Sequence, residues 1–390
     1  MRPLRLFATL TGVPALLGAR STRSVRGAGR TRSVSSSDSL SGVGGTAPAP
    51  DRPPARAALR AWAELLRVSA LFTVPGDALA GAAAAGRRPT RGTALAVGAS
   101  LCLYEAGMAL NDWADRDEDA VDRPHRPIPS GRIAPGAALA AAGVLTAAGL
   151  TLAARAGRPA LAVASGLAAT VWAYDLHLKH TKAGPAAMAA ARTLDLLLGA
   201  TATGPATAAT TAPTAATATG TAERGATRAA LPAALLLGAH TYAVTAVSRH
   251  EAQGGSTAVP LAALAATMAL GAAVVRERRG DQGPPRFPAA GAAVGAEEPP
   301  RPPLRPRAAT DRLLLTTFAG AYLRTAAPPL LHAALNPSPP LTQRAVGGGI
   351  RAMIPLQAAL AVRAGAPLGG LAVMGLVPLA RTLARKVSPT

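Results

Sequence analysis

The sequence predicts an all-α protein: a polytopic membrane bundle of about nine transmembrane helices. Of its 390 residues, 49% are hydrophobic and only 16% are charged. Apolar runs of roughly 17 to 23 residues recur along the chain, and this is the length that a helix needs to cross a bilayer. The runs consist mainly of Ala, Leu, Gly and Val, and such small residues let membrane helices pack closely.

The N-terminal region, residues 1–55, differs from the rest in composition. It is rich in Arg, Ser and Pro, and Asp38 is its only acidic residue before Asp51. This composition favours a disordered leader. Two alternatives to a disordered leader are open. One is an organellar transit peptide, which is also Arg- and Ser-rich and poor in acids, and the other is a start codon placed too far upstream. We expect residues 56–390 to form one membrane domain.

The first half of this domain is expected to hold five spans. The first is predicted as a single helix over residues 57–85, amphipathic at its start and apolar afterwards. The others are predicted at residues 93–111, 134–154 and 159–174, and from Pro185 onward. Residues 204–228 are a Thr-, Ala- and Gly-rich low-complexity stretch, which we expect to be a loop.

The second half is expected to add four or five spans. They are predicted at residues 229–247, 257–275 and 312–335. Between the last two, the Pro-, Arg- and Gly-rich residues 276–311 are expected to form an extended or disordered loop. Residues 344–384 are expected to hold one long helix pair or two short spans, so ten spans are an alternative to nine.

The net charge of +21 comes almost entirely from arginine, since Lys occurs only at positions 179, 182 and 386. A basic protein can bind nucleic acid. Here the arginines fall in the N-terminal tail and the loops, without aromatic residues for base stacking. We therefore expect no nucleic acid, and instead anionic membrane lipids and a phosphorylated substrate as partners. The Arg-rich, Lys-poor composition is typical of a GC-rich bacterial genome. For a multi-pass membrane protein of bacterial origin we expect the plasma membrane.

Cys102 is the single cysteine, so neither an intrachain disulfide nor a cysteine metal site is expected.

The most informative stretch is residues 111–133, which read NDWADRDEDAVDRPHRPIPSGRI. On a continuing helix, spacings of three and four would place Asn111, Asp112, Asp115 and Asp119 on one face. Carboxylates so close repel one another unless a cation lies among them, and Mg²⁺ takes oxygen ligands that it shares with substrate phosphates. Arginines follow at once, so the stretch predicts a diphosphate site. The alternatives are a solvated acidic loop and arginines that anchor to lipid headgroups.

Three polar loops fall on one side of the membrane in this topology. They are the acidic stretch, YDLHLKHTKAGP at 174–185 and SRHEAQGGS at 248–256. Loops on the same side of the membrane are able to form one pocket, and this holds whether that side is cytoplasmic or external. The arginines of the N-terminal tail and of the first of these loops indicate the cytoplasmic side.

The first of these loops resembles a known motif. Asn111-Asp-x-x-Asp115-x-x-x-Asp119, with the following DRPHRPIPSGRI, is similar to the first aspartate-rich motif of the UbiA superfamily of membrane prenyltransferases. Tyr174 and Lys179 resemble the Tyr/Lys loop of that family. The resemblance extends over residues 57–385 and implies a UbiA-like helix bundle.

The second motif of the family is altered in this chain. Its usual form is D-x-x-x-D-x-x-x-G, and alignment on Gly255 places Glu251 at the second acid and Val247 at the first. One acid is therefore longer and the other is missing, as in some divergent bacterial members. A complete second metal site is not expected, and Arg249 is a candidate for supplying positive charge instead.

The resemblance implies Mg²⁺-dependent transfer of a prenyl group from an isoprenoid diphosphate to a lipophilic acceptor, with aromatic acceptors among the candidates. It implies metal ligands at Asp112, Asp115, Asp119 and Glu251, and a catalytic role for the three aspartates and Lys179. It implies substrate contacts from Asn111, Arg123, Arg126, Tyr174, Arg249 and Arg67. Two alternatives remain, which are a catalytically inactive UbiA-fold protein and a lipid-binding or transport protein. A transporter would show no Mg²⁺ dependence, and an inactive homologue would bind without turnover.

Further charges fall inside the apolar runs. Arg192 and Asp195 are three residues apart and are expected to form a buried pair or to act in function. Asp77 and Glu105 are similar cases with less support from the sequence.

Overall fold

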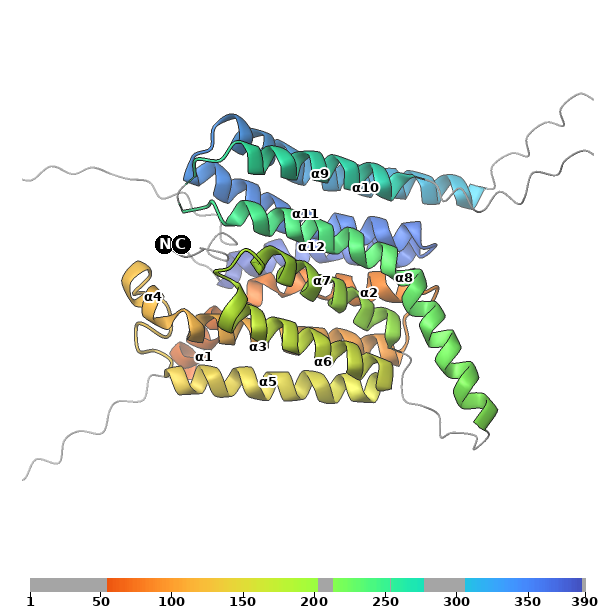
Figure 1. The fold of residues 1–390 in the computed structure, drawn as a ribbon, viewed down its shortest axis with the longest axis horizontal. Helices are drawn as coiled ribbons and strands as arrows, with labels where there is room; N and C mark the ends of the chain where they lie inside the picture. Colours follow the sequence, from red (N-terminus) through yellow and green to blue (C-terminus); the bar gives the residue numbers. More distant parts are fainter. Residues whose placement is uncertain (1–54, 203–212, 253, 277–305, 388–390) are drawn as a thin grey trace, which may run out of the picture.

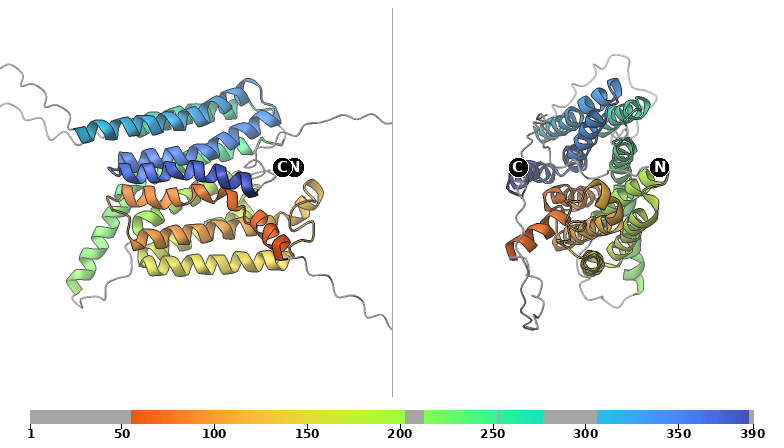
Figure 2. Two further views of the ribbon diagram at one scale, coloured as in Figure 1. Left: turned by 180° about the vertical axis from the view of Figure 1, so that it is seen from behind. Right: turned by 90° about the vertical axis from the view of Figure 1, so that its left-hand side faces the viewer.

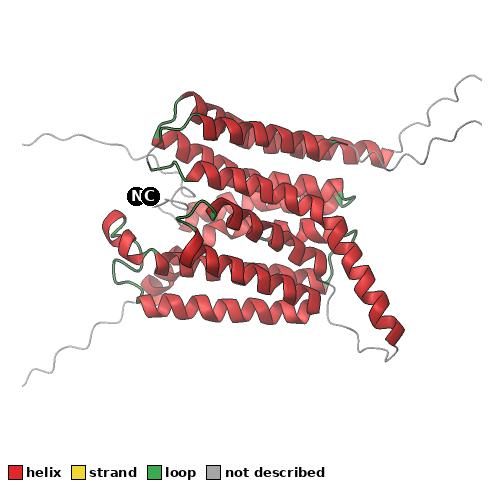
Figure 3. Ribbon diagram, viewed as in Figure 1, coloured by secondary structure: helices red, strands yellow, loops and turns green. Residues whose placement is uncertain are grey.

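A computed structural model describes residues 55–202, 213–252, 254–276 and 306–387. All regular structure in that part of the chain is helical (Figure 3), which confirms the predicted fold class. The long helices lie side by side in an elongated bundle (Figure 1). The predicted leader at residues 1–54 and most of the loop predicted at 276–311 lie outside the described residues.

The helices follow the order of the predicted spans. The first half contains α1 (Ala55–Leu65), α2 (Pro75–Ala84), α3 (Arg91–Ala114), α4 (Arg116–Asp122), α5 (Pro135–Ala156), α6 (Arg158–Ala173) and α7 (Gly184–Thr201). The second half contains α8 (Pro213–Ser248), α9 (Ala258–Val275), α10 (Pro306–Leu335), α11 (Pro339–Arg363) and α12 (Pro367–Val387). A 3-10 turn, Val68–Thr73, precedes α2, and a π-helical turn, Tyr174–Leu178, extends α6.

Many of these helices have the length and hydropathy of membrane spans. Within the described residues six qualify: Arg91–Ala114, Pro135–Ala156, Arg158–Leu178, Gly225–Ser248, Ala258–Val275 and Pro339–Arg363. Two shorter apolar helices, Leu71–Ala84 and Pro367–Pro378, accompany them. The helices α7 and α10 are not among these but pack in the same bundle, where α7 lies against α2 and α8, and α10 against α9 and α11. The segment predicted at 344–384 is two helices, α11 and α12.

The predicted single helix over residues 57–85 is wrong. After α1 the chain turns at Arg67, whose φ of 49° lies in the left-handed region, and the 3-10 turn then leads into α2. Pro75 has no backbone N–H to donate to a preceding turn, which favours the start of a new helix at this position. Seen from behind in Figure 2, α1 is tilted against the other helices.

The predicted loop at 204–228 is wrong in its second half, because α8 already begins at Pro213. Alanine has the highest helix propensity of all residues, and the sequence between Pro213 and Pro232 contains no further proline to interrupt the helix. The first part of α8 projects away from the bundle in Figure 1.

Small residues allow α2 and α7 to pack closely. A Cβ atom at Gly81 would come within 1.9 Å of the carbonyl oxygen of Leu196, and one at Gly199 within 2.2 Å of that of Ala78. Backbone meets backbone at both positions, so only glycine fits. This contact fixes α7, which carries Arg192 and Asp195, against α2, which carries Asp77.

The three predicted polar loops lie at one end of the bundle, as expected. In Figure 1 the end of α3 with α4, the turn between α6 and α7, and the end of α8 are all at the left. The Lys179 side chain contacts Asp115, and Arg249 donates a hydrogen bond to the carbonyl oxygen of Thr181. These contacts join the second loop to the first and to the third.

Candidate functional site

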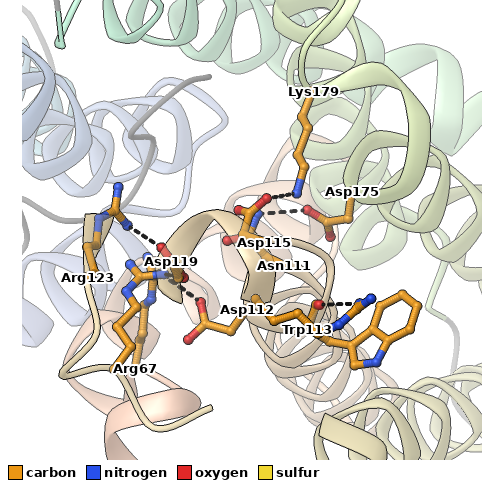
Figure 4. A network of polar contacts seen from close by, with 11 residues as sticks. Arg67, Asn111, Asp112, Trp113, Asp115, Asp119, Arg123, Asp175 and Lys179 are labelled. Carbon is orange, nitrogen blue, oxygen red and sulfur yellow. Dashed lines mark hydrogen bonds and ion pairs between the residues drawn. The ribbon is translucent and has the colours of Figure 1, made fainter. Parts of the chain in front are cut away.

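The acidic stretch is not one continuous helix, contrary to the prediction. Asp115 ends α3 with a ψ of 4°, and α4 begins in a new direction at Arg116. The aspartates do not share one face. Figure 4 shows Asp112 and Asp119 turned toward a group of arginines, while Asp115 is turned to the opposite side, toward Lys179.

On the first side, arginines neutralise two buried carboxylates. The Arg126 guanidinium donates to Asp112 at 3.1 Å and to Asp119 at 2.6 Å. Arg67 donates to the same Asp112 oxygen at 3.1 Å, and Arg123 lies 3.6 Å from Asp119. The left-handed conformation of Arg67 thus brings the end of α1 to the acidic stretch. In this arrangement the predicted substrate-binding arginines and two of the predicted metal ligands bind one another.

The second side is built by α3 and the π-helical turn after α6. Lys179 Nζ donates to Asp115 Oδ1, and Asn111 Nδ2 donates to Asp175 Oδ1 at 3.2 Å. Lys179 and Asp175 are both buried, with exposed fractions of 7% and 4%. Asp175 was missed by sequence reasoning, although its position at the end of an apolar run beside Tyr174 was a usable signal.

One group of metal-ligating atoms occurs among the described residues. One carboxylate oxygen each of Asp115 and Glu118 and one ring nitrogen of His180 all lie within 4.8 Å of one another. Burial and the neighbouring carboxylates of Asp115, Asp119 and Asp122 raise the pKa of Glu118. Burial and the neighbouring Lys179 charge lower the pKa of His180. Carboxylate oxygens and an unprotonated imidazole nitrogen are donors that suit a divalent cation. Neither Glu118 nor His180 is among the site residues predicted from the sequence.

The third loop closes the end of the bundle. Glu251, in the turn after α8, is buried, with an exposed fraction of 1%. Gly254 and Gly255 both have positive φ, which lets this loop turn sharply, and Gly255 donates a backbone hydrogen bond to Pro337 at 2.8 Å. The metal role predicted for Glu251 and the substrate role predicted for Arg249 stay predictions.

A cavity extends from the polar end into the bundle. It has about 130 Å³ of space for water-sized groups, and most of its lining is apolar. Tyr174 and Asp175 lie at its polar end, whereas Tyr104, Arg192 and His240 lie about two helical turns deeper along their helices. Tyr174, predicted to contact substrate, is therefore buried against this cavity.

A network of buried polar groups borders the cavity at this depth. Arg192 binds Asp77, and Gln357 donates to the same carboxylate at 2.7 Å. Asp195 lies 4.0 Å from Arg192 and accepts a hydrogen bond from Ser100. The pair expected from the sequence, Arg192 with Asp195, is thus the weaker contact, and the stronger one is with Asp77, 115 positions earlier in the chain.

Parts of this chain are similar in sequence to known synthases. A segment of 128 residues is 37% identical to digeranylgeranylglyceryl phosphate synthase of Methanopyrus kandleri, covering 32% of this chain and 45% of that protein. The enzyme of the same name from Ignicoccus hospitalis is 34% identical over 146 residues, or 37% and 48% of the two chains. A shorter segment of 26 residues is 69% identical to the bacteriochlorophyll synthase 33 kDa chain of Rhodobacter capsulatus, 7% and 9% of the two chains. These matches span less than half of the relatives.

Two solved structures are similar in outline. A UbiA homologue from Archaeoglobus fulgidus bound to GPP and Mg²⁺ matches with a TM-score of 0.44 and 15% identity, covering 81% of this chain and 99% of that one. One from Aeropyrum pernix gives 0.46 and 19%, covering 73% and 96%. The family model described as UbiA prenyltransferase family matches residues 70–291, which is more than half of the chain. The helical membrane bundle described here is accordingly that of a member of the UbiA prenyltransferase family.

Proposed function

We propose that this protein transfers a prenyl group from an isoprenoid diphosphate to a lipophilic acceptor within the membrane. The observation that carries the proposal is that the acidic and basic side chains lie beside the polar end of an apolar cavity, where Asn111 of the acidic stretch donates a hydrogen bond to the cavity-lining Asp175. The acidic stretch and the Lys179 loop meet at the polar end, through the contact of Lys179 with Asp115. A diphosphate needs the polar end, and an isoprenoid tail needs the apolar cavity.

Mg²⁺ is the cation proposed for this site. Mg²⁺ supplies positive charge that stabilises the diphosphate as it leaves. Asp115 and Glu118 offer the carboxylate oxygens for it. Asp112 and Asp119, which the sequence also proposes as ligands, contact arginines here, and for them the metal role requires exchange of those partners. The binding of GPP and Mg²⁺ by the Archaeoglobus fulgidus homologue is consistent with this cation.

The side chains of this chain bind and orient the donor. Lys179, Arg123 and Arg126 are proposed to contact the diphosphate oxygens, Lys179 as a compact charge and the arginines as planar forks. Asn111, Tyr174, Arg67 and Arg249 are proposed to complete the substrate contacts. The bond between the first prenyl carbon and the diphosphate oxygen breaks, the acceptor nucleophile bonds to that carbon, and the acceptor loses a proton.

We further propose that the protein lies in a bacterial plasma membrane with this site on the cytoplasmic side. The arginines of the acidic loop support this orientation. The acceptor is proposed to be lipophilic because the cavity is largely apolar.

The test is release of diphosphate by the purified protein in detergent. Dimethylallyl, geranyl, farnesyl and geranylgeranyl diphosphates are each supplied with Mg²⁺ or with EDTA, with and without a lipid extract as the source of acceptor. The proposal expects Mg²⁺-dependent release and a prenylated lipid product with at least one donor. Binding of donor without release, in the presence of the extract, would identify an inactive family member. No binding of any donor would favour a transport or lipid-binding role.

A further inference from the structure

We propose that His180 is a ligand of the metal ion at this site, together with Asp115 and Glu118, and that the site therefore binds Mn²⁺ more tightly than Mg²⁺. The inference rests on the proposed function for what the ion does, but binding of the ion does not require turnover.

The geometry brings donors from two separate segments together. Asp115 ends α3 and Glu118 lies in the first turn of α4, whereas His180 comes from the loop after α6, more than 60 residues later. Their ligand atoms lie within 4.8 Å of one another. Ligand bonds of small divalent cations are about 2.1 Å long, so opposite ligands of one ion are about 4 Å apart. Small side-chain rotations therefore suffice to bring the three atoms around one ion.

The neighbouring contact fixes this arrangement. Lys179, adjacent to His180, is buried and bound to Asp115, so the loop cannot move away from the end of α3 without breaking that ion pair. His180 itself is exposed, which leaves the remaining coordination positions accessible to water or to a substrate oxygen.

The local charge favours a cation here. Glu118 lies among the carboxylates of Asp115, Asp119 and Asp122, and Lys179 is the cation that opposes them. Arginines already neutralise Asp119. A divalent ion between Asp115 and Glu118 would relieve the remaining repulsion on the side of the site that Lys179 faces.

The donor set decides which ion is preferred. Mg²⁺ binds almost entirely through oxygen, whereas imidazole nitrogen suits first-row transition ions. A site with two carboxylates and one imidazole accepts Mn²⁺, and the nitrogen raises affinity for Mn²⁺ over Mg²⁺. The competing explanation is that His180 is an exposed side chain that happens to follow Lys179.

The chain offers a matched control. His177 lies in the same segment, is also exposed, and does not belong to the ligand group. The purified full-length protein, His180→Gln and His177→Gln are titrated with Mn²⁺ and examined by electron spin echo spectroscopy, which detects an imidazole nitrogen bound to the ion. Circular dichroism and gel filtration establish that each variant is folded, and Glu118→Gln serves as a second variant.

The expected result is a nitrogen coupling in the unchanged protein and in His177→Gln that disappears in His180→Gln. Mn²⁺ affinity should fall at least about tenfold in His180→Gln and in Glu118→Gln, while Mg²⁺ affinity should change less in His180→Gln. A nitrogen coupling that persists in His180→Gln, or none in the unchanged protein, would overturn the inference. Diphosphate release measured on the same samples reports separately on the proposed function. A nitrogen coupling to bound Mn²⁺ without any diphosphate release would contradict the proposed function but would still support His180 as a ligand.

Discussion

Lys179 and Asp115 form an ion pair that joins the loop after α6 to the end of α3, across 64 positions of sequence. The Lys179 side chain is only 8% exposed and that of Asp115 18%. The pair lies with Asn111 and Asp175 on one side of the acidic stretch, and the arginines lie with Asp112 and Asp119 on the other (Figure 4). A substrate diphosphate bound between them would contact both sides.

Lys179→Met is expected to weaken donor binding. The substitution removes a buried cation beside Asp115, so the KM for prenyl diphosphate should rise about tenfold or more. Lys182→Met is the matched control, because Lys182 is exposed in the same loop, and its KM should change less than twofold. Equal effects of the two substitutions would mean that the loop acts only through its charge at the membrane surface.

Arg126→Gln is expected to destabilise the fold as well as the site. Arg126 bridges Asp112 and Asp119, and its loss leaves two buried carboxylates with less positive charge between them. Thermal unfolding in detergent should show a loss of about 2 to 3 kcal/mol. Arg116→Gln removes an ion pair with the exposed Asp117 and contacts with Trp113 from a side chain that is itself 36% exposed, and should cost about 1 kcal/mol or less. An unchanged unfolding temperature in Arg126→Gln would show that the bridge contributes no stability.

Arg192→Gln should lower stability more than the double substitution Asp77→Asn with Arg192→Gln. The single change leaves the carboxylate of Asp77 buried without its guanidinium partner, while the double change removes both charges. The difference is measured as a coupling energy in a double-mutant cycle of unfolding temperatures, and we expect a coupling of about 2 kcal/mol. Additive effects would contradict a direct ion pair between the two residues.

Gly81→Ala is expected to push α2 and α7 apart. The added Cβ would come within 1.9 Å of the Leu196 carbonyl oxygen, and backbone atoms cannot yield as a flexible side chain does. We expect a loss of about 2 kcal/mol in detergent. Gly143→Ala, in α5, meets nothing within 4 Å and should leave stability unchanged or slightly raise it. A neutral Gly81→Ala would mean that the two helices separate easily.

The helical membrane fold could be predicted from sequence because long apolar runs admit few other structures. The clustering of the three polar loops at one end followed from counting spans. The partner of each aspartate could not be predicted, because spacing along a helix does not show where the loops that carry Arg126 and Lys179 will fold.

Ion pairs between residues far apart in the sequence could not be predicted either. Asp77 binds Arg192 rather than any neighbour in sequence, since the close approach of α2 and α7 decides the contact. The conformation of Arg67 also gave no signal, because a positive φ is uncommon outside glycine and nothing in the local sequence requires it. His180 lies near Asp115 and Glu118 only because of how the loop after α6 folds, and spacing along the sequence does not predict this.

Diphosphate release by Asp115→Asn and Asp117→Asn, compared with the unchanged protein in Mg²⁺ and in EDTA, tests the central claim most directly. The two residues lie two positions apart, but Asp115 belongs to the ligand group and Asp117 is exposed. Prenyl transfer at this site predicts release that requires Mg²⁺ or Mn²⁺, falls about 100-fold or more in Asp115→Asn, and stays within twofold in Asp117→Asn. Release that persists in EDTA, or that survives equally in both variants, would contradict a metal-dependent reaction at the end of α3.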